Sequence, residues 1–350
     1  PVGFNISSWC DAVQVAGSWY YPCMISTSGI VRCIDLGWQR QFAGKKIVAL
    51  ESGTSHKLCA IDHLGQVVCA GDCRGDCTFP SDSSYVAVAG GNGHACALTS
   101  IGNLVCVGSD ESGQSSIARS LTDVVQICAG AGHTCLVRAD RSVACAGYEV
   151  DAATQTGTKA GLTPPPADFS VVATNSFGSF SCGKRADSTL SCWGAFAVGQ
   201  TVPPPTPMST FALGGSHGCG FDALTGEIRC WGSCGYGWST CFPDSTPGRY
   251  SSLALATGYT CGILRSNSRV ECFGHNPYWA FANWPSVAFK QISAAFNYVC
   301  GITTNGQPPR PVVCADHVCA GTAHCSSALA TYYFPGNFSY VVAGQFLACG

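Results

Sequence analysis

YVAVAGGNGHACALTSIGNLVCVG, residues 85–108, contains the unit from which the fold can be inferred. It consists of a short apolar strand, a Gly-rich bend, a second strand with a Cys, a turn, and a third strand with another Cys. The same pattern recurs along the 350 residues with a period of about forty. Because self-similarity at a fixed period is the signature of repeat architectures, the repeat outranks any local motif in predicting the fold.

Eight copies of this unit carry a pair of cysteines, and the first Cys of each pair serves here as the anchor of its repeat. The two are ten residues apart in the first five copies, eleven in the next two and fourteen in the last. The pairs are Cys23 and Cys33, Cys59 and Cys69, Cys96 and Cys106, Cys135 and Cys145, Cys182 and Cys192, Cys219 and Cys230, Cys261 and Cys272, and Cys300 and Cys314.

The spacing within each pair predicts a disulfide across a β-hairpin. Gly or a polar residue near the midpoint, such as Gly65 or Gly102, suits the hairpin turn. Two Cys placed symmetrically about a turn face each other on adjacent antiparallel strands, where Cα atoms can lie about 4.5 Å apart. Eight buried free thiols are the alternative, which so Cys-rich a chain disfavours.

In the segment before each anchor, residues alternate with a period of two, and small side chains are frequent, as in Val13–Ala16 and Val86–Ala89. Such strands suit the crowded inner positions around a central axis. Trp-Gly or a related pair follows the second Cys, as in Trp193-Gly194 and Trp231-Gly232. We expect these aromatic residues to pack between neighbouring repeats.

The sequence AGAGHTC at residues 129–135, and the pattern x-x-G-x-V-x-C-W-G that follows such anchors, resemble the regulator-of-chromosome-condensation repeat. The Cys pair within each repeat resembles more closely the ectodomain of Crinkly-type plant receptor kinases. The resemblance covers nearly the whole chain and implies a β-propeller of short antiparallel sheets, with seven blades as in those relatives.

The repeat count departs from that family, because the two ends together resemble a ninth copy. Residues 338–350 (FSYVVAGQFLACG) read as a first half with Cys349 as its anchor, and Ser8-Trp9-Cys10 reads as a second half. We therefore predict one all-β domain, a disulfide-stapled propeller of about nine blades, closed by a repeat split between the termini. The predicted repeats are 11–45, 46–83, 84–121, 122–168, 169–207, 208–249, 250–287, 288–337, and 338–350 with 1–10.

The remaining cysteines fit the same scheme. A Cys10–Cys349 disulfide would close the ring, and the alternative is that Cys349 of one chain meets Cys10 of the next in a head-to-tail polymer. Three further pairs begin four or five residues after a repeat's second Cys and are expected to staple outer loops: Cys73 and Cys77, Cys234 and Cys241, and Cys319 and Cys325. Cys128 is left over at a small-residue position, where a buried free thiol is favoured over an intermolecular bond.

Composition places the chain outside the cell. The sequence has 25 Cys and 42 Gly, only 11% charged residues and a net charge of −2. So many cysteines indicate an oxidising compartment, hence a secreted or cell-surface protein. Without a basic face, nucleic acid is not an expected partner, and without an apolar run of eighteen residues this segment is not expected to insert into a membrane.

Motifs associated with catalysis, metals or cofactors are weak here. Gly214–Gly218 matches the G-x-S-x-G nucleophile motif but falls in the ordinary bend of a repeat. His94, His133 and His217 share one repeat position, which favours a structural role. A zinc site from His317, Cys319, His324 and Cys325 would need thiols that a disulfide consumes. The carboxylates form no recurring pair, and no phosphate loop is present. We expect neither an enzyme nor a cofactor.

A few short motifs point to the cell surface. Asn5 and Asn337 lie in N-x-S glycosylation patterns. Arg74-Gly75-Asp76, between Cys73 and Cys77, resembles an integrin-binding loop, and the alternative is a solvated turn. Proline runs at 164–166 and 203–205 favour polyproline II and are expected to be exposed spacers.

The sequence predicts an extracellular, non-enzymatic propeller that serves as a structural or protein-interaction module, with protein partners, self-association or glycans as its contacts. A subunit of an extracellular assembly or filament is one form of this function. The alternatives are a ligand-binding receptor ectodomain, which the Crinkly resemblance implies, and a secreted lectin or enzyme inhibitor.

Overall fold

The computed structural model describes most of the chain between residues 23 and 348. The described residues are 23–26, 29–33, 36–52, 57–71, 77–119, 121–150, 157–158, 162–175, 180–194, 199–233, 246–274, 287–294, 298–304, 312–316, 330–334, 338–342 and 347–348. Among them, no helix is long and apolar enough to cross a membrane.

Eight antiparallel sheets of three or four strands are present in the described part of the chain. In seven of them, three consecutive strands form a meander: β3 (Ile47–Ser52), β4 (Lys57–Asp62) and β5 (Val67–Gly71); β6 (Tyr85–Gly90), β7 (His94–Thr99) and β8 (Leu104–Gly108); β9 (Val124–Ala129), β10 (His133–Arg138) and β11 (Val143–Gly147); β14 (Phe169–Thr174), β15 (Phe180–Arg185) and β16 (Leu190–Gly194); β17 (Met208–Leu213), β18 (His217–Asp222) and β19 (Ile228–Gly232); β20 (Tyr250–Leu255), β21 (Tyr259–Leu264) and β22 (Val270–Gly274); β23 (Phe289–Ala294), β24 (Tyr298–Thr303) and β25 (Val312–Asp316).

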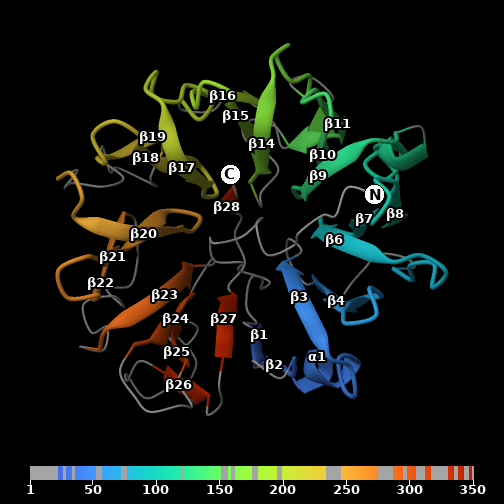
Figure 1. Cartoon of the computed structure of the whole chain (residues 1–350), viewed down its shortest axis with the longest axis horizontal. Coiled ribbons are helices and arrows are strands. Elements are labelled where there is room, and N and C mark those ends of the chain that lie inside the picture. Colours follow the sequence, from blue (N-terminus) through green and yellow to red (C-terminus); the bar gives the residue numbers. More distant parts are fainter. Residues whose placement is uncertain are drawn as a thin grey trace.

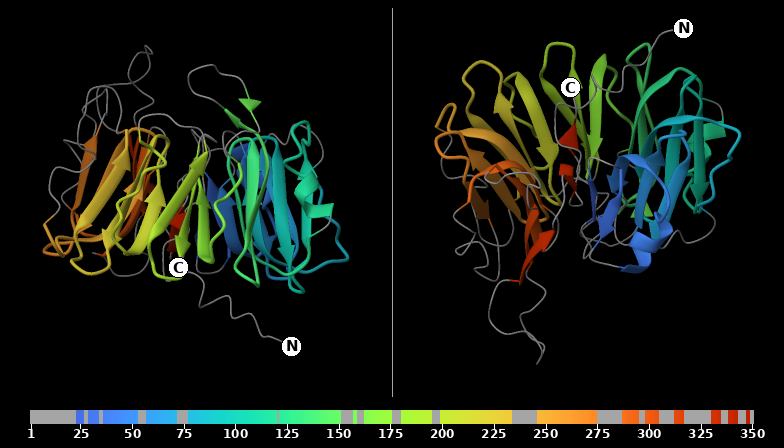
Figure 2. Two further views of the ribbon diagram at one scale, coloured as in Figure 1. Left: turned by 90° about the horizontal axis from the view of Figure 1, so that it is seen from above. Right: turned by 60° about the horizontal axis from the view of Figure 1, so that its bottom comes forward.

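The sheets stand around a central axis like the blades of a propeller (Figure 1). The first strand of each meander is nearest the axis, and the disc is seen from its edge in Figure 2. The smaller elements are α1 (Leu36–Gln41), the 3-10 helix η2 (Ser116–Arg119), the ribbon of β12 (Glu149–Val150) and β13 (Gly157–Thr158), and β26 (Ala330–Phe334), which adds a fourth strand beside β25. The predicted all-β propeller is confirmed.

Strands from near both ends of the chain share one sheet. The eighth sheet joins β1 (Cys23–Ser26) and β2 (Val31–Cys33) to β27 (Phe338–Val342), which lies beside β1 as the inner strand. This pairing covers the edge of β1 with β27, while the grouping of 338–350 with 1–10 into one repeat stays a prediction. Residues 1–22 lie outside the described residues, so the count of nine blades stays a prediction.

The chain's last described strand, β28 (Leu347–Ala348), pairs with β17. The pairing places Ala348 opposite Phe211 and Leu347 opposite Ala212. In Figure 1 this short strand lies near the centre of the ring. The C-terminal segment thus contributes strands to two sheets, those of β1 and β17.

Disulfides join the second and third strands of seven sheets, each between Cα partners directly opposite in register. The Cα atoms of each pair are 4.0–4.1 Å apart, the close spacing of a non-hydrogen-bonded antiparallel pair. The seven are Cys23–Cys33, Cys59–Cys69, Cys96–Cys106, Cys135–Cys145, Cys182–Cys192, Cys219–Cys230 and Cys261–Cys272. Cys300 is also disulfide-bonded and lies opposite Cys314.

Every inner strand of the seven meanders carries a β-bulge at its second residue, as the register shift between Tyr85 and Ala87 shows. Equivalent shifts occur in the other six meanders. A bulge bends the strand and increases its twist. Each blade is therefore bent at the same place, where its inner strand begins.

A backbone hydrogen bond ties the start of each inner strand to the hairpin turn of the preceding repeat. The amide of Tyr85 donates to the carbonyl of Gly65 at 2.8 Å, and the amide of Phe169 to that of Arg141 at 3.0 Å. The amides of Ile47, Val124, Met208 and Phe289 donate in the same way to the carbonyls of Gly29, Gly102, Ser188 and Ser268. Ahead of β20 the donor is Gly248, two residues before the strand begins, and the acceptor is Gly226.

The acceptor at each of these junctions has a positive φ. Four are glycines, but Arg141, Ser188 and Ser268 hold φ of 67°, 66° and 58°. This conformation costs an L-residue roughly 1–2 kcal/mol. Its recurrence without glycine indicates that the turn geometry is imposed by the repeat.

Apolar clusters cross from blade to blade, as expected for the Trp residues of the outer strands. Trp193 packs against Phe169 of its own blade, with ring centroids 5.5 Å apart, and joins Cys135 and Val137 of the preceding blade in one cluster. Trp231 similarly joins Phe180 of the preceding blade. The core therefore lies between the sheets rather than within any one of them.

Removing one hairpin disulfide should lower stability without changing the fold. Replacing Cys96 and Cys106 together by Ser frees a ten-residue loop in the unfolded chain, which should cost about 2–3 kcal/mol. Urea unfolding without reductant measures this loss. As a control, Cys128→Ala removes a free thiol without opening a loop, and should cost less than half as much. A double variant as stable as the parent would contradict the proposed role of the disulfides.

Candidate interaction surface

The disc has two faces that differ in what they expose. We call the hairpin face the side formed by the turns between second and third strands, together with the segments that enter the inner strands there. We call the bend face the opposite side, formed by the bends between first and second strands: residues 91–93, 130–132, 214–216 and 256–258. The left view of Figure 2 shows the disc from its side, with one face above and the other below.

The bend face is tightly closed. A Cβ atom on Gly91 would lie 1.9 Å from the ring of His94 and 2.7 Å from the carbonyl oxygen of Gly130 in the next repeat. Across the same junction, the amide of Asn92 donates to the carbonyl of Ala131 at 2.9 Å. Glycine is required here because the His ring and the neighbouring backbone occupy the space of a side chain.

The repeated histidines join neighbouring blades. Nε2 of His94 lies 2.8 Å from Oγ1 of Thr134, one repeat later. The same contact links His133 to Ser181 at 2.9 Å and His217 to Thr260 at 2.7 Å. The hydroxyl-bearing residue always precedes the anchor Cys of the next blade.

This histidine position varies together with its partner in the next repeat. Phe180 stands at the histidine position where the next blade presents Gly218, and Tyr259 where it presents Val299. Lys57 takes the place of His in its repeat, is fully buried, and donates through Nζ to the carbonyl of His94. Sequence reasoning missed the pairing, although a His followed one repeat later by Ser or Thr was a usable signal.

Burial keeps these histidines neutral. It lowers the pKa of His133 and of His217 from 6.5 to about 4. For His94, burial and the nearby Lys57 ammonium lower the pKa to about 3. Neutral rings locked between blades have no access to solvent, so we assign them to the frame of the ring and not to a reactive site.

The hairpin face carries the exposed apolar side chains. Among the described residues, six large aliphatic side chains are exposed: Ile30, Val48, Leu64, Ile101, Val202 and Leu224. Four of them stand in hairpin turns, Val48 stands at the bulge of β3, and Val202 lies in the segment that enters β17. Leu64, Ile101 and Leu224 occupy the same repeat position, five residues after the anchor, where Asp140 and Asp187 stand in two other repeats.

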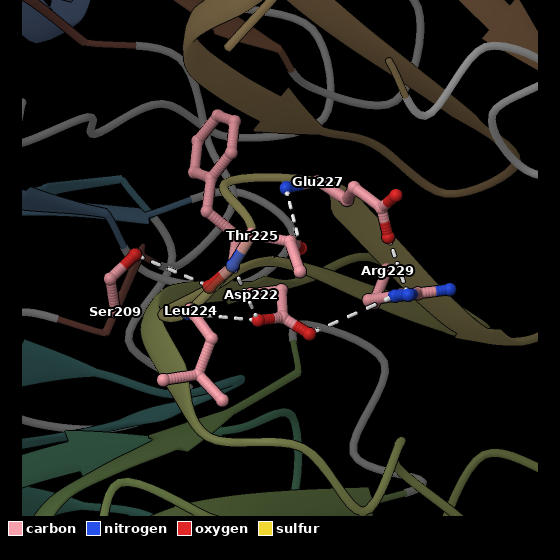
Figure 3. Close-up of polar contacts among 7 residues, drawn as sticks. Ser209, Asp222, Leu224, Thr225, Glu227 and Arg229 are labelled. Atoms are coloured by element: carbon pink, nitrogen blue, oxygen red, sulfur yellow. Dashed lines mark hydrogen bonds and ion pairs between the residues drawn. The ribbon is translucent and has the colours of Figure 1, made fainter. Parts of the chain in front are cut away.

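Figure 3 shows how one such turn is held. Asp222, buried at the end of β18, accepts hydrogen bonds from the amides of Leu224 at 2.9 Å and Thr225 at 3.1 Å. These bonds lower the pKa of the Asp222 carboxyl. Arg229 lies beside Asp222 and forms an ion pair with Glu227. These contacts with buried Asp222 fix the backbone of the turn, while the Leu224 side chain stays 81% exposed.

The motif at Gly214–Gly218 covers the bend between β17 and β18 and the first two residues of β18, so a strand follows the turn in place of the helix that a nucleophile elbow needs. The Ser216 hydroxyl lies 2.7 Å from the carbonyl oxygen of Ser233 and 3.2 Å from that of Thr257. Ser216 therefore links loop backbone on the bend face. Within the described ranges, no group of three or more His, Cys, Asp or Glu could hold a metal ion.

Several predicted residues lie outside the described residues. They are Cys10, Cys73, Cys234, Cys241, Cys319, Cys325, Cys349, His317, His324, Arg74, Gly75, Asp76, Asn5 and Asn337. Cys77 is disulfide-bonded. Cys128 is a buried free cysteine whose Sγ lies 3.6 Å from the carbonyl oxygen of Cys135, and burial raises its pKa to about 12.

Comparison with known proteins supports the repeat family and the fold. Residues 85–114 match the model of the regulator of chromosome condensation (RCC1) repeat. The WD40 ectodomain of the Arabidopsis thaliana receptor kinase ACR4 is similar in structure, with a TM-score of 0.53 and 21% identity over 77% of this chain and 95% of that one. The ectodomain of the Physcomitrella patens receptor kinase CR4 gives 0.54 and 22%, over 77% and 74%.

A third similar structure is Prp20p from Saccharomyces cerevisiae, with a TM-score of 0.50 and 13% identity over 99% of this chain and 96% of that one. Identities this low show the fold alone. The resemblance to propellers of RCC1-type repeats, inferred from the sequence, is confirmed by the repeat match and these neighbours together.

Acid should weaken the ring through its buried histidines. Because the folded-state pKa values lie below 6.5, the unfolded chain binds more protons between about pH 6.5 and pH 4, and stability falls as the pH drops through this window. The variant His217→Gln keeps a hydrogen-bonding side chain near Thr260 but cannot titrate. Between about pH 7 and pH 4.5 it should lose about 2 kcal/mol less stability than the parent, measured by urea unfolding. An unchanged pH dependence would exclude His217 as a contributor.

Proposed function

We propose that this protein is a secreted or cell-surface propeller that acts as a non-enzymatic protein-interaction module through its hairpin face. One observation carries the proposal. In the described part of the chain the exposed large aliphatic side chains stand on the hairpin turns and the segments entering the inner strands, while the anchor Cys and the His that precedes it in three repeats are buried in the frame. Apolar groups gathered on one side of a molecule indicate a contact surface.

The disulfides support the location. Seven hairpin disulfides are present, and bonds of this kind form and persist in oxidising environments such as the extracellular space. They also limit how far each blade can open. A rigid disc with varied turns suits a module whose specificity lies in its loops.

The first three repeats offer the most continuous apolar surface. Ile30, Val48, Leu64 and Ile101 are 49–79% exposed and belong to consecutive repeats. The junction from Ile47 to Gly29 brings the first turn beside the start of β3, next to Val48. Fully burying such side chains gives about 1.5–3 kcal/mol each, enough for four of them to contribute substantially to a protein contact.

Two forms of this function follow from the sequence. In one, the partner is another copy of the chain, and a Cys10–Cys349 bond between chains would make a covalent filament. In the other, the propeller is the ligand-binding ectodomain of a receptor; two ectodomains of receptor kinases among the similar structures support this form.

Photo-crosslinking from defined positions tests the proposal. A photoreactive residue replaces Leu64 or Ile101 on the hairpin face, and the labelled protein is exposed to the extracellular fraction of its source tissue. We expect one protein to crosslink from both positions. The purified partner should then bind the parent at least about ten times more tightly than the variant Leu64→Asp with Ile101→Asp, since two buried aliphatics are lost.

Glu111 provides the control position. Its side chain is exposed in the loop that follows β8. This loop begins at the bend face, because the amide of Ser109 donates to the carbonyl of Gly93 in a bend. A photoreactive residue there should not capture the partner. Equal capture from Glu111, or unchanged affinity of the double Asp variant, would reject the hairpin face as the contact surface.

A further inference from the structure

Two proline segments occupy the same place in consecutive repeats. Residues 163–166 (TPPP) precede the inner strand β14, and residues 202–205 (VPPP) precede β17 at the same distance. Their exposure pattern is identical: the first and fourth residues are exposed, and the second and third are half-buried. A pattern shared residue by residue indicates one local conformation built twice.

The period of this exposure fits polyproline II. That conformation has three residues per turn, so residues three apart lie on one edge. Thr163 and Pro166 would share the outer edge of the first segment, and Val202 and Pro205 that of the second. The prolines have no N–H to donate, so the backbone there presents only carbonyl acceptors.

An earlier repeat, that of β6, shows how such a carbonyl can be used internally. Pro80 stands at the position of Pro164 and Pro203, five residues before the inner strand, and its carbonyl accepts a hydrogen bond from the Tyr85 hydroxyl at 3.2 Å. In the two proline-rich repeats, the residue at the position of Tyr85 is Phe169 or Met208. Neither side chain can donate, so this internal bond is missing from both repeats.

Both segments are held firmly at their ends. Leu162 is 7% exposed and Gln200 is 4% exposed, so the chain is buried just before each segment. After each segment, the amides of Phe169 and Met208 are fixed to the carbonyls of Arg141 and Ser188. The sheets β14–β16 and β17–β19 that follow them are neighbours in the ring (Figure 1).

We propose that residues 163–166 and 202–205 form a two-part docking site for a protein partner with aromatic-lined grooves. Grooves of this kind bind polyproline II by packing aromatic rings against proline rings, with indole and phenol groups donating to the open carbonyls. A preordered segment loses little entropy on binding. Two segments on adjacent blades favour a partner with two grooves, because the second contact is made at high effective concentration. This site is separate from the exposed aliphatic side chains of the first three repeats, Ile30, Val48, Leu64 and Ile101, which we call the aliphatic tips.

A WW domain, which carries one aromatic-lined groove, serves as the probe, alone and as a tandem of two copies with a flexible linker. Titration followed by tryptophan fluorescence should show the tandem binding at least about tenfold more tightly than the single domain. Replacing Pro164, Pro165 and Pro166 by Ala should reduce the tandem to the affinity of the single domain. Replacing the prolines of both segments should abolish binding.

Two further variants separate docking from loss of fold. Pro80→Ala changes the repeat whose carbonyl is already used by Tyr85, and should leave binding of the tandem unchanged. Phe169→Tyr places a hydroxyl where Tyr85 has one, so that it can donate to the carbonyl of Pro164. It should weaken binding of the probe to the first segment alone, although no proline is removed. The thermal midpoint of each variant is measured in parallel.

The proposal is overturned if neither form of the WW domain binds, if the tandem is no tighter than the single domain, or if the Pro80 variant loses as much affinity as the triple variant. It is also overturned if intact mass of the secreted protein shows glycans on these prolines, since sugar would cover the outer edges. Binding by an unmodified protein that fails only when the proline segments are changed supports it.

Discussion

The hydrogen bond from the start of each inner strand to the preceding hairpin turn is the contact on which the ring depends. It is made by backbone atoms, so it survives the loose conservation of side chains between repeats. Its acceptor keeps a positive φ even at Arg141, Ser188 and Ser268. Each blade is thus positioned by the previous one before any side chain is considered, and short sheets of three strands gain the neighbour they need to bury an apolar face.

On the opposite face, side chains complete the same junctions. At three of the bends, Gly91, Gly130 and Gly214 leave room for a His ring, and the ring reaches a hydroxyl in the next blade. Where the hydroxyl is absent, as at Gly218 and Val299, an aromatic residue fills the site instead. The bend face therefore uses its side chains for the frame, whereas the junctions on the hairpin face are made by backbone atoms, so the side chains of that face can vary. The aliphatic tips and the two proline segments both lie on the side that the frame leaves free.

The strands, hairpins and cysteine partners could be predicted from the sequence because each depends on local spacing. A ten-residue gap around a turn determines which residues face each other, whichever blade it belongs to. The placement of β27 beside β1 could not be predicted this way, since Phe338 begins a segment with the pattern of an inner strand and its partner depends on ring closure. The bulges at Val48 and Ser170 could not be predicted from the sequence either. In a strand of six residues, one extra residue does not change the alternation of side chains enough to be recognised.

The contacts of the histidines with the next blade could be predicted from the sequence only in part. Their residues were recognised as structural, but the partner forty or more residues away was visible only by comparing successive repeats. The missing hydroxyl donor at the proline segments could be recognised only from the structure, because the Tyr85 contact to Pro80 reveals what Phe169 and Met208 lack. Sequence patterns thus predict what a repeat does within itself, and structure adds what one repeat does to the next.

Hydrogen exchange at the inter-repeat amides tests the central claim, that the ring is a frame locked blade to blade with its variation on the hairpin face. The amides of Tyr85, Phe169 and Met208 are the first in their strands, where fraying would ordinarily make exchange fast. We predict that they exchange as slowly as amides in the middle of β7 and β15. Exchange at the rate of exposed loops would contradict the account, because the blades would then be joined only by side-chain packing.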